Sequence, residues 1–123
     1  MINLMAIAAG GAVGALLRHG VNMLAAGLLF PWGTLFVNIA GSLCMGLLVG
    51  AFAGFWDVSQ TTRLFLTVGF LGAFTTFSAF SLDAVLMLQK GQIILGLSYI
   101  LASVICSLGA LALGLFLVRM IPA

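Results

Sequence analysis

Charged side chains are the scarcest feature of this sequence. Its 123 residues include four Lys or Arg and two Asp or Glu, so that only 5% of the chain is charged. Soluble domains carry about 25% charged residues, and a chain with so few cannot build a solvated surface. The chain is instead 64% hydrophobic. This composition excludes a soluble globular enzyme and predicts a helical membrane protein.

Clustered charge and reactive-cysteine motifs are missing as well. The basic residues are scattered along the chain, which leaves no patch for nucleic acid or for polybasic lipid recognition. Cys44 and Cys106 lie in apolar stretches outside any CxxC or His-rich context, so we expect packing residues rather than a disulfide or a metal site. The N-terminus has no basic n-region, which argues against a cleaved signal peptide and for a first helix that stays in the membrane.

The length accommodates four membrane spans. A spanning helix needs about 20 residues, so 123 residues leave room for four helices and three short connections. Apolar stretches bounded by Pro, Gly and polar residues predict helices at about 4–29, 34–55, 64–88 and 93–120. Residues 58–62 (VSQTT) are mostly polar and are expected to form a connection. No linker or repeat divides the chain, so residues 1–123 are predicted to form one all-α transmembrane domain.

The charges give a weak signal for orientation in the membrane. With four spans, the side that holds both termini and the second connection carries Arg63 and Arg119, and the other side carries Lys90. Cytoplasmic loops usually hold the excess of Lys and Arg, and a two-to-one split barely satisfies that rule. Two interpretations stay open: a poorly determined topology, or a chain that inserts both ways and pairs with its inverted copy.

Small and polar residues recur at every fourth position in three of the predicted helices, and therefore share one face of each. The rows are Gly10, Gly14, Arg18 and Asn22; Thr34, Asn38, Ser42, Gly46 and Gly50; and Tyr99, Ser103 and Ser107. For the glycines we expect close helix packing. Asn38 and the row that begins at Tyr99 place hydrogen-bonding groups near mid-membrane, where they either line a transport path or hold helices together.

Arg18 lies inside the first predicted helix. A guanidinium within a span is costly and usually faces protein or water. Arg18 is therefore expected either to pair with backbone carbonyls or to lend positive potential to an anion path.

The third predicted helix contains the most unusual stretch, GFLGAFTTFSAFS at 69–81. Two glycines followed by four hydroxyl residues in seven make a poor continuous membrane helix, and freed backbone groups are tolerated at this depth only inside protein or beside a cavity. We expect an interruption near 72–75, whose carbonyls can hold a cation and whose amides can meet an anion. Phe74, Phe77 and Phe80 recur at every third position and are expected to share a face, with Phe74 an ordinary packing residue.

Composition alone leaves the sign of a transported ion open. A phenylalanine ring has an electropositive edge that suits an anion and an electronegative face that suits a cation. Cation and proton carriers usually display Asp or Glu within the membrane, and Asp83 is the only acidic residue in the four predicted helices. Together with Arg18, this scarcity slightly favours an anion.

The same motifs resemble the Fluc (CrcB) fluoride channels of bacteria over nearly the whole chain. The resemblance rests on GGAVGALLR at 10–18, PWGTLFVN at 31–38 and the stretch at 69–81, which occur in the family's order and at matching spans. It implies an antiparallel, dual-topology homodimer in the bacterial inner membrane, with two fluoride pores and a central structural sodium ion.

The resemblance also implies roles for individual residues. The pore positions that match are Asn38, Phe77, Ser78, Phe80, Tyr99, Ser103 and Ser107. Phe77 and Phe80 match the phenylalanines whose ring edges face the ions. The backbone carbonyls of Gly72 and Thr75 match those that hold sodium, and Arg18 matches an arginine near the vestibule.

Three positions depart from the family pattern. Ala79 stands where many members have Thr, Leu111 where some have a hydroxyl, and Asp83 where relatives often have Glu. These differences concern individual polar contacts and leave the family resemblance intact.

The sequence therefore predicts a passive channel, not an enzyme, that lets fluoride leave the cytoplasm. An inside-negative potential drives an anion outward by about 2.3 kcal/mol per charge per 100 mV, so no coupled fuel is needed. Two alternatives remain. The first is a small four-helix cation or multidrug exporter of the dual-topology type, which needs a membrane carboxylate that the first helix lacks. The second is a non-transporting membrane subunit, which needs a larger complex to pack against.

Overall fold

The computed structural model describes residues 1–122 and consists of helices joined by short connections. The elements are α1 (Ile2–Leu24), α2 (Trp32–Gly54), α3 (Gln60–Leu64), the π-helical η1 (Phe65–Leu71), α4 (Gly72–Phe74), α5 (Phe77–Gln89) and α6 (Ile93–Arg119). Four segments are long and apolar enough to cross a membrane: Ile2–Leu24, Trp32–Gly54, Gln60–Gln89 and Ile93–Arg119. The prediction of an all-helical chain with four spans is confirmed.

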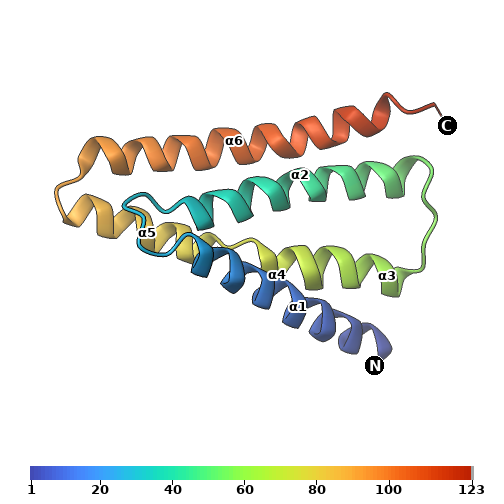
Figure 1. Ribbon diagram of the computed structural model, residues 1–123. Helices are drawn as coiled ribbons and strands as arrows, with labels where there is room; N and C mark the ends of the chain where they lie inside the picture. Colours follow the sequence, from blue (N-terminus) through green and yellow to red (C-terminus); the bar gives the residue numbers. More distant parts are fainter. Residues whose placement is uncertain (123) are drawn as a thin grey trace.

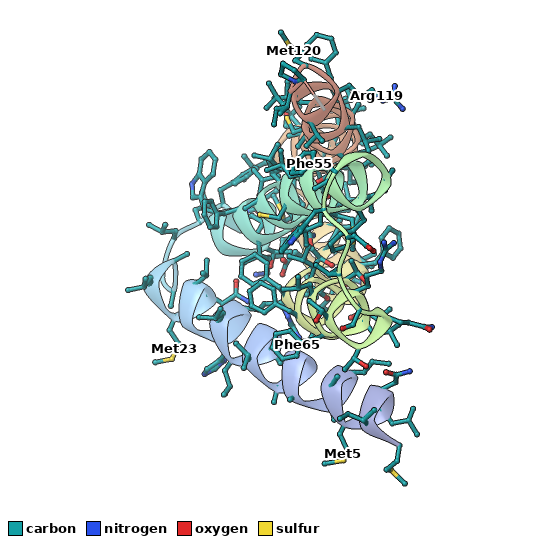
Figure 2. The ribbon with its side chains drawn as sticks, turned by 90° about the vertical axis from the view of Figure 1, so that its right-hand side faces the viewer. Met5, Met23, Phe55, Phe65, Arg119 and Met120 are labelled. Atoms are coloured by element: carbon teal, nitrogen blue, oxygen red, sulfur yellow. The ribbon has the colours of Figure 1, made fainter. Side chains whose placement is uncertain are left out.

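The spans run alternately up and down, so that both ends of the described chain and the connection at 55–59 lie at one end (Figure 1). The connections at 25–31 and 90–92 lie at the other end, where Gly27 and Gly91 adopt the left-handed backbone with φ of 86° and 80°. Viewed end-on, the helices succeed one another from α6 through α2 and the third span to α1 (Figure 2). The two main contacts are α2 along α6 and α1 along η1.

Two of the predicted helix boundaries are wrong by several residues. The first helix ends at Leu24 rather than 29, because the chain turns at 25–27 and Gly27 takes a conformation that no helix contains. The third span begins at Gln60 rather than 64. There the hydroxyl of Ser59 caps the helix by accepting a hydrogen bond from the Thr62 N–H at 3.2 Å, so polar residues that were expected in a connection are helical instead.

Glycines let α1 and the third span approach each other closely. Gly10, Gly14 and Gly69 are buried, and a Cβ atom on Gly10 would lie 2.5 Å from the carbonyl oxygen of Phe65. A Cβ atom on Gly69 would lie 2.8 Å from the carbonyl oxygen of Ile7. Since real Cβ atoms need more room, only glycine permits this spacing. The expected packing role of the glycines in the first row agrees with this contact.

The contact between α2 and α6 is equally tight. A Cβ atom on Gly114 would lie 2.6 Å from the carbonyl oxygen of Leu43, and one on Gly46 would collide with the carbonyl oxygen of Leu111. By contrast, Cys44 and Cys106 are free and exposed rather than buried in packing, because they lie on faces of α2 and α6 that no other described helix covers.

We predict that Gly46→Ala destabilises the protein, because the added methyl group forces α2 and α6 apart. Overpacking of this kind costs about 1–3 kcal/mol. Thermal unfolding in detergent measures the loss. Gly109→Ala is the matched control in α6, since nothing lies within 4 Å of the position its Cβ would take. Equal unfolding temperatures for the two variants would contradict the packing role of Gly46.

Candidate functional site

The third span is interrupted at Thr75 and Thr76, between α4 and α5. Both residues are extended, with φ and ψ of −87° and 159° at Thr75 and of −155° and 121° at Thr76. The predicted interruption is therefore present, but it begins later than expected: Gly72 is helical, with φ of −60° and ψ of −35°. Thr75 ends the first half of the span, and both its N–H and its hydroxyl donate to the Leu71 carbonyl, at 3.1 and 3.0 Å.

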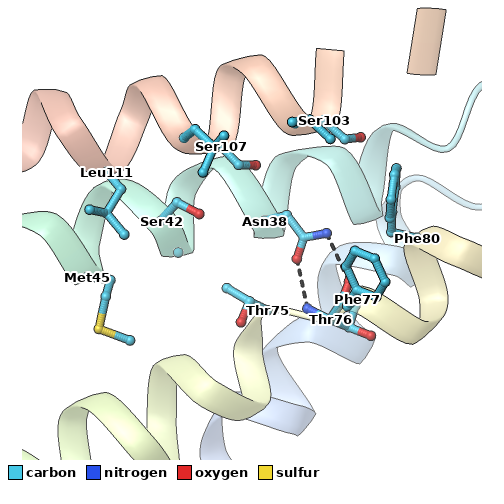
Figure 3. A pocket seen from close by; sticks show the side chains of 13 residues that line it. Asn38, Ser42, Met45, Thr75, Thr76, Phe77, Phe80, Ser103, Ser107 and Leu111 are labelled. Carbon is cyan, nitrogen blue, oxygen red and sulfur yellow. Dashed lines mark hydrogen bonds between the residues drawn. The ribbon is translucent and has the colours of Figure 1, made fainter. Parts of the chain in front are cut away.

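Asn38 on α2 bonds to both backbone groups of Thr76. Its Nδ2 donates to the Thr76 carbonyl at 3.0 Å, and its Oδ1 accepts from the Thr76 N–H at 2.7 Å. Figure 3 shows the amide pointing from α2 to the interruption. The hydroxyl of Thr76 in turn accepts from the Ala79 N–H at 3.1 Å and so caps α5. Peptide groups released from the helix are thereby satisfied by side chains.

Arg18 on α1 reaches the same region from the other side. Its Nε donates to the carbonyl of Ala73, in the last turn before the interruption, at 3.0 Å. Of the two alternatives predicted for Arg18, pairing with a backbone carbonyl is confirmed. A cation beside a helix C-terminus is also favourable for the helix dipole.

A groove opens between α2, α5 and α6 beside the interruption (Figure 3). Its volume is 490 Å³. The residues that line it are uncharged: Asn38, Gly41, Ser42, Met45, Thr75, Thr76, Phe77, Phe80, Ser103, Val104, Ser107, Leu108 and Leu111. The groove is open along one side, so this chain alone does not enclose a pore.

Two hydroxyl groups in the groove lack partners. The Oγ atoms of Ser103 and Ser107 are buried, and neither finds a hydrogen-bond partner among residues 1–122. A buried hydroxyl without a partner is costly. These two groups are therefore available to a ligand or to water within the groove.

Aromatic rings form one end of the groove. The centroids of Phe77 and Phe80 are 5.5 Å apart, and that of Phe80 lies 5.3 Å from that of Tyr99. Tyr99 is fully buried, and its hydroxyl donates to Asp83 Oδ2 at 3.2 Å. Phe74 does not share their face: it stacks on Phe70 with centroids 6.0 Å apart, because the interruption separates it from α5.

The structure brings together five of the residues predicted for the pore, namely Asn38, Phe77, Phe80, Ser103 and Ser107. Two others do not line the groove. Ser78 is exposed, with its hydroxyl 3.3 Å from that of Thr76, and Tyr99 lies behind Phe80. Arg18 and Gly72 also lie outside the groove lining.

Sequence reasoning missed the role of Thr76. It was noticed only as one of four hydroxyl residues, although a Thr just before a run of helical residues is a recognisable capping signal. Met45, Val104 and Leu108 were missed as well, since apolar residues of a membrane helix carry no signal that separates a groove from lipid.

The arrangement suits the passage of a small ion better than covalent chemistry. Ring edges, hydroxyl groups and an amide can replace water around an ion that has lost part of its hydration shell. No group of three His, Cys, Asp or Glu side chains gathers in the described part of the chain. The interruption also supplies backbone carbonyl oxygens, which can hold a metal ion.

Fold and groove together define a multi-pass membrane protein whose third span is broken at a polar groove. A family model described as "CrcB-like protein, Camphor Resistance (CrcB)" matches residues 5–115. The chain belongs to this family, and the resemblance seen in the motifs is confirmed.

Similar bacterial proteins cover the whole chain. The fluoride-specific ion channel FluC 1 of Nitrobacter hamburgensis is 46% identical over 121 residues, which are 96% of each chain. The fluoride-specific ion channel FluC of Chelativorans sp. is 51% identical over 125 aligned positions, covering 98% of this chain and 99% of the relative. That of Sphingopyxis alaskensis is 49% identical over 126 aligned positions, covering 100% of both. The chain is a multi-pass bacterial membrane protein, similar to ion channels and not to enzymes.

Proposed function

We propose that this protein is a passive, fluoride-selective channel of the bacterial inner membrane that lets fluoride leave the cytoplasm. The observation that carries the proposal is the uncharged groove at the broken third span, in a chain about half identical to proteins named fluoride-specific ion channels. A channel needs no bound fuel, because the membrane potential itself drives the anion outward.

The fluoride path is proposed to follow the groove. Phe77 and Phe80 offer ring edges, and the unpaired hydroxyls of Ser103 and Ser107 offer hydrogen-bond donors. Ring-edge hydrogens and hydroxyl hydrogens both carry partial positive charge, so these side chains can substitute for water around an anion. Ser78 and Tyr99 are proposed for the path from the family resemblance, although they lie outside the groove lining of the single chain.

Arg18 is proposed to act near the vestibule through its charge. Its Nε is already bonded to the Ala73 carbonyl. The positive charge of the guanidinium still contributes to the potential that an approaching anion meets.

A second copy of the chain, inserted in the opposite orientation, is proposed to close the groove. The side chain of Phe77 is 78% exposed although it lines the groove, which is expected if a partner covers it. The weak charge asymmetry of the sequence is also compatible with insertion in both orientations. Each of the two copies then contributes one groove, which gives two pores per dimer.

One sodium ion on the two-fold axis of the dimer is proposed to hold the two interruptions together. The residues present fit this ion, because the carbonyls of Gly72 and Thr75 lie at a helix end whose regular hydrogen bonding is lost. Gly72 is exposed in the single chain, as an oxygen shared with a partner requires. Bound there, the ion supplies a fixed positive charge and holds the two chains together.

A cation or multidrug exporter is less compatible with the groove. Such a carrier needs a carboxylate that both proton and substrate reach. None of the thirteen residues that line the groove is acidic, and Asp83 is engaged by the hydroxyl of Tyr99.

We predict that the purified protein in liposomes releases fluoride rapidly when a potassium ionophore supplies the counter-current, and releases almost no chloride. An ion-selective electrode measures both anions. Equal release of chloride and fluoride would contradict selectivity, and release that requires a proton gradient would indicate a coupled exporter. No release at all would indicate a subunit without transport activity.

We also predict that Phe80→Ile, and separately Phe77→Ile, abolishes or severely slows fluoride release while the protein still assembles. Isoleucine keeps most of the bulk but has no electropositive ring edge. The same liposome assay measures the rate, and size-exclusion chromatography checks assembly. Phe74→Ile is the matched control, since this ring stacks on Phe70 and does not line the groove. Native rates in the two test variants would remove both rings from the path.

A further prediction concerns dual topology. In a variant whose exposed Cys44 and Cys106 are replaced by Ala, a single thiol introduced as Gln60→Cys should be labelled from each face of the membrane in about equal amounts. Position 60 is exposed and uncharged, so the substitution leaves the charge balance intact. A membrane-impermeant maleimide applied to intact and then to opened cells gives the two fractions. Labelling from one face alone would contradict the inverted dimer.

A further inference from the structure

Two N–H groups at the interruption are diverted from the carbonyls that they would meet in a continuous helix. In an α-helix each N–H donates to the carbonyl four residues earlier, so that Thr76 would pair with Gly72 and Ala79 with Thr75. Instead, the Thr76 N–H donates to Asn38 Oδ1 at 2.7 Å, and the Ala79 N–H donates to Thr76 Oγ1 at 3.1 Å. The two carbonyls released in this way are those of the proposed sodium site.

Asn38 holds Thr76 at two points. Besides accepting from the Thr76 N–H, the amide donates from Nδ2 to the Thr76 carbonyl at 3.0 Å. This pairing with both the N–H and the carbonyl of one extended residue resembles the contact between neighbouring β-strands. A two-point contact also fixes the rotation of the peptide, which a single hydrogen bond does not.

The element that carries Asn38 is itself firmly placed. The buried Gly41, one turn further along α2, lies against the side chain of Thr75, and the buried Gly46 lies against the backbone of α6. The amide is therefore presented to Thr76 from a packed helix rather than from a loop.

We infer that Asn38 is a positioning residue for the sodium site: it keeps the Thr76 N–H away from the Gly72 carbonyl and so leaves that oxygen to the ion. The inference rests on the proposed function. It gives Asn38 a second role besides lining the groove. Asn38 acts through Thr76. Without its amide, the Thr76 N–H can return to Gly72 and continue the helix, which withdraws one ligand oxygen from each copy.

The hydroxyl of Thr76 has the corresponding effect on the second oxygen. It accepts the Ala79 N–H, which would otherwise pair with the Thr75 carbonyl. A carbonyl that accepts a helical hydrogen bond points along the axis toward the N–H four residues later, and it is thereby turned away from a neighbouring chain. Asn38 and Thr76 thus keep two different carbonyls available for one ion.

The test measures how sodium stabilises the dimer. The unfolding temperature of the purified native protein and of each variant is measured in detergent at increasing concentrations of sodium chloride. N-methylglucamine chloride keeps the ionic strength constant. The quantity recorded is the half-effect concentration, the sodium concentration that gives half of the full shift in unfolding temperature. Loss of a residue that orients a metal ligand typically weakens metal affinity about 10- to 100-fold. We expect Asn38→Ala to raise the half-effect concentration by such a factor. Thr76→Val should raise it too, and Thr76→Ser, which keeps the hydroxyl, should not.

Ser107→Ala is the matched control, because Ser107 lines the same groove but makes no hydrogen bond to the interruption. It should slow fluoride release in liposomes and leave the half-effect concentration of sodium at the native value. If Asn38→Ala slows fluoride release but keeps the native half-effect concentration, Asn38 acts only in the groove and the inference is wrong.

The remaining outcomes also decide the matter. If Asn38→Ala does not assemble, Asn38→Leu, which keeps the bulk of the side chain but cannot accept the Thr76 N–H, decides in its place, and an unchanged sodium response there overturns the inference. In another outcome, the native protein conducts fluoride and yet is equally stable in sodium and in N-methylglucamine. That result would contradict both the sodium site and this inference, but not the channel function. Native protein that responds to sodium but releases no fluoride contradicts the channel and leaves the role of Asn38 to the variants.

Discussion

A backbone that leaves the helix inside a membrane must find new partners for its N–H and C=O groups, because hydrocarbon offers none. The rest of this structure depends on how that requirement is met at Thr75 and Thr76. The partners are side chains: Asn38 from α2, Arg18 from α1 and the hydroxyl group of Thr76 itself. The interruption can exist only where α1, α2 and the third span meet at one depth.

Close helix packing brings these partners within reach. Gly14 lies against the backbone of η1, and Arg18 is one turn further along the same face of α1. Gly41 lies against the side chain of Thr75, and Asn38 is about one turn earlier on α2. A larger residue at either glycine would push the helix away and take the guanidinium or the amide out of hydrogen-bond range. Small and polar residues in these rows therefore act together, although the sequence suggested separate roles for them.

Features that depend on length and hydrophobicity could be predicted from the sequence. Features that depend on contacts between helices were placed less accurately. Four spans follow from composition alone. The interruption was also predicted, near 72–75, and it lies at Thr75 and Thr76. Gly72 itself stays helical, and the helix is broken where Asn38 and the Thr76 hydroxyl replace the lost hydrogen bonds. The π-helical turns of η1 had no sequence signal. Five groove residues were named by family resemblance, whereas their convergence required α2, α5 and α6 in place.

The interruption would also allow one uncharged site to serve the two proposed ions of opposite sign. The first half of the third span ends at Phe74, and its last carbonyls carry partial negative charge; α5 begins at Phe77, and its first N–H groups carry partial positive charge. These two helix ends are separated by only two residues. A proposed cation at the carbonyl end and a proposed anion beside the rings of α5 each meet the helix end of opposite charge. Placing a buried Asp or Lys there would favour one ion and repel the other, so a groove lined by neutral residues is the arrangement that accommodates both.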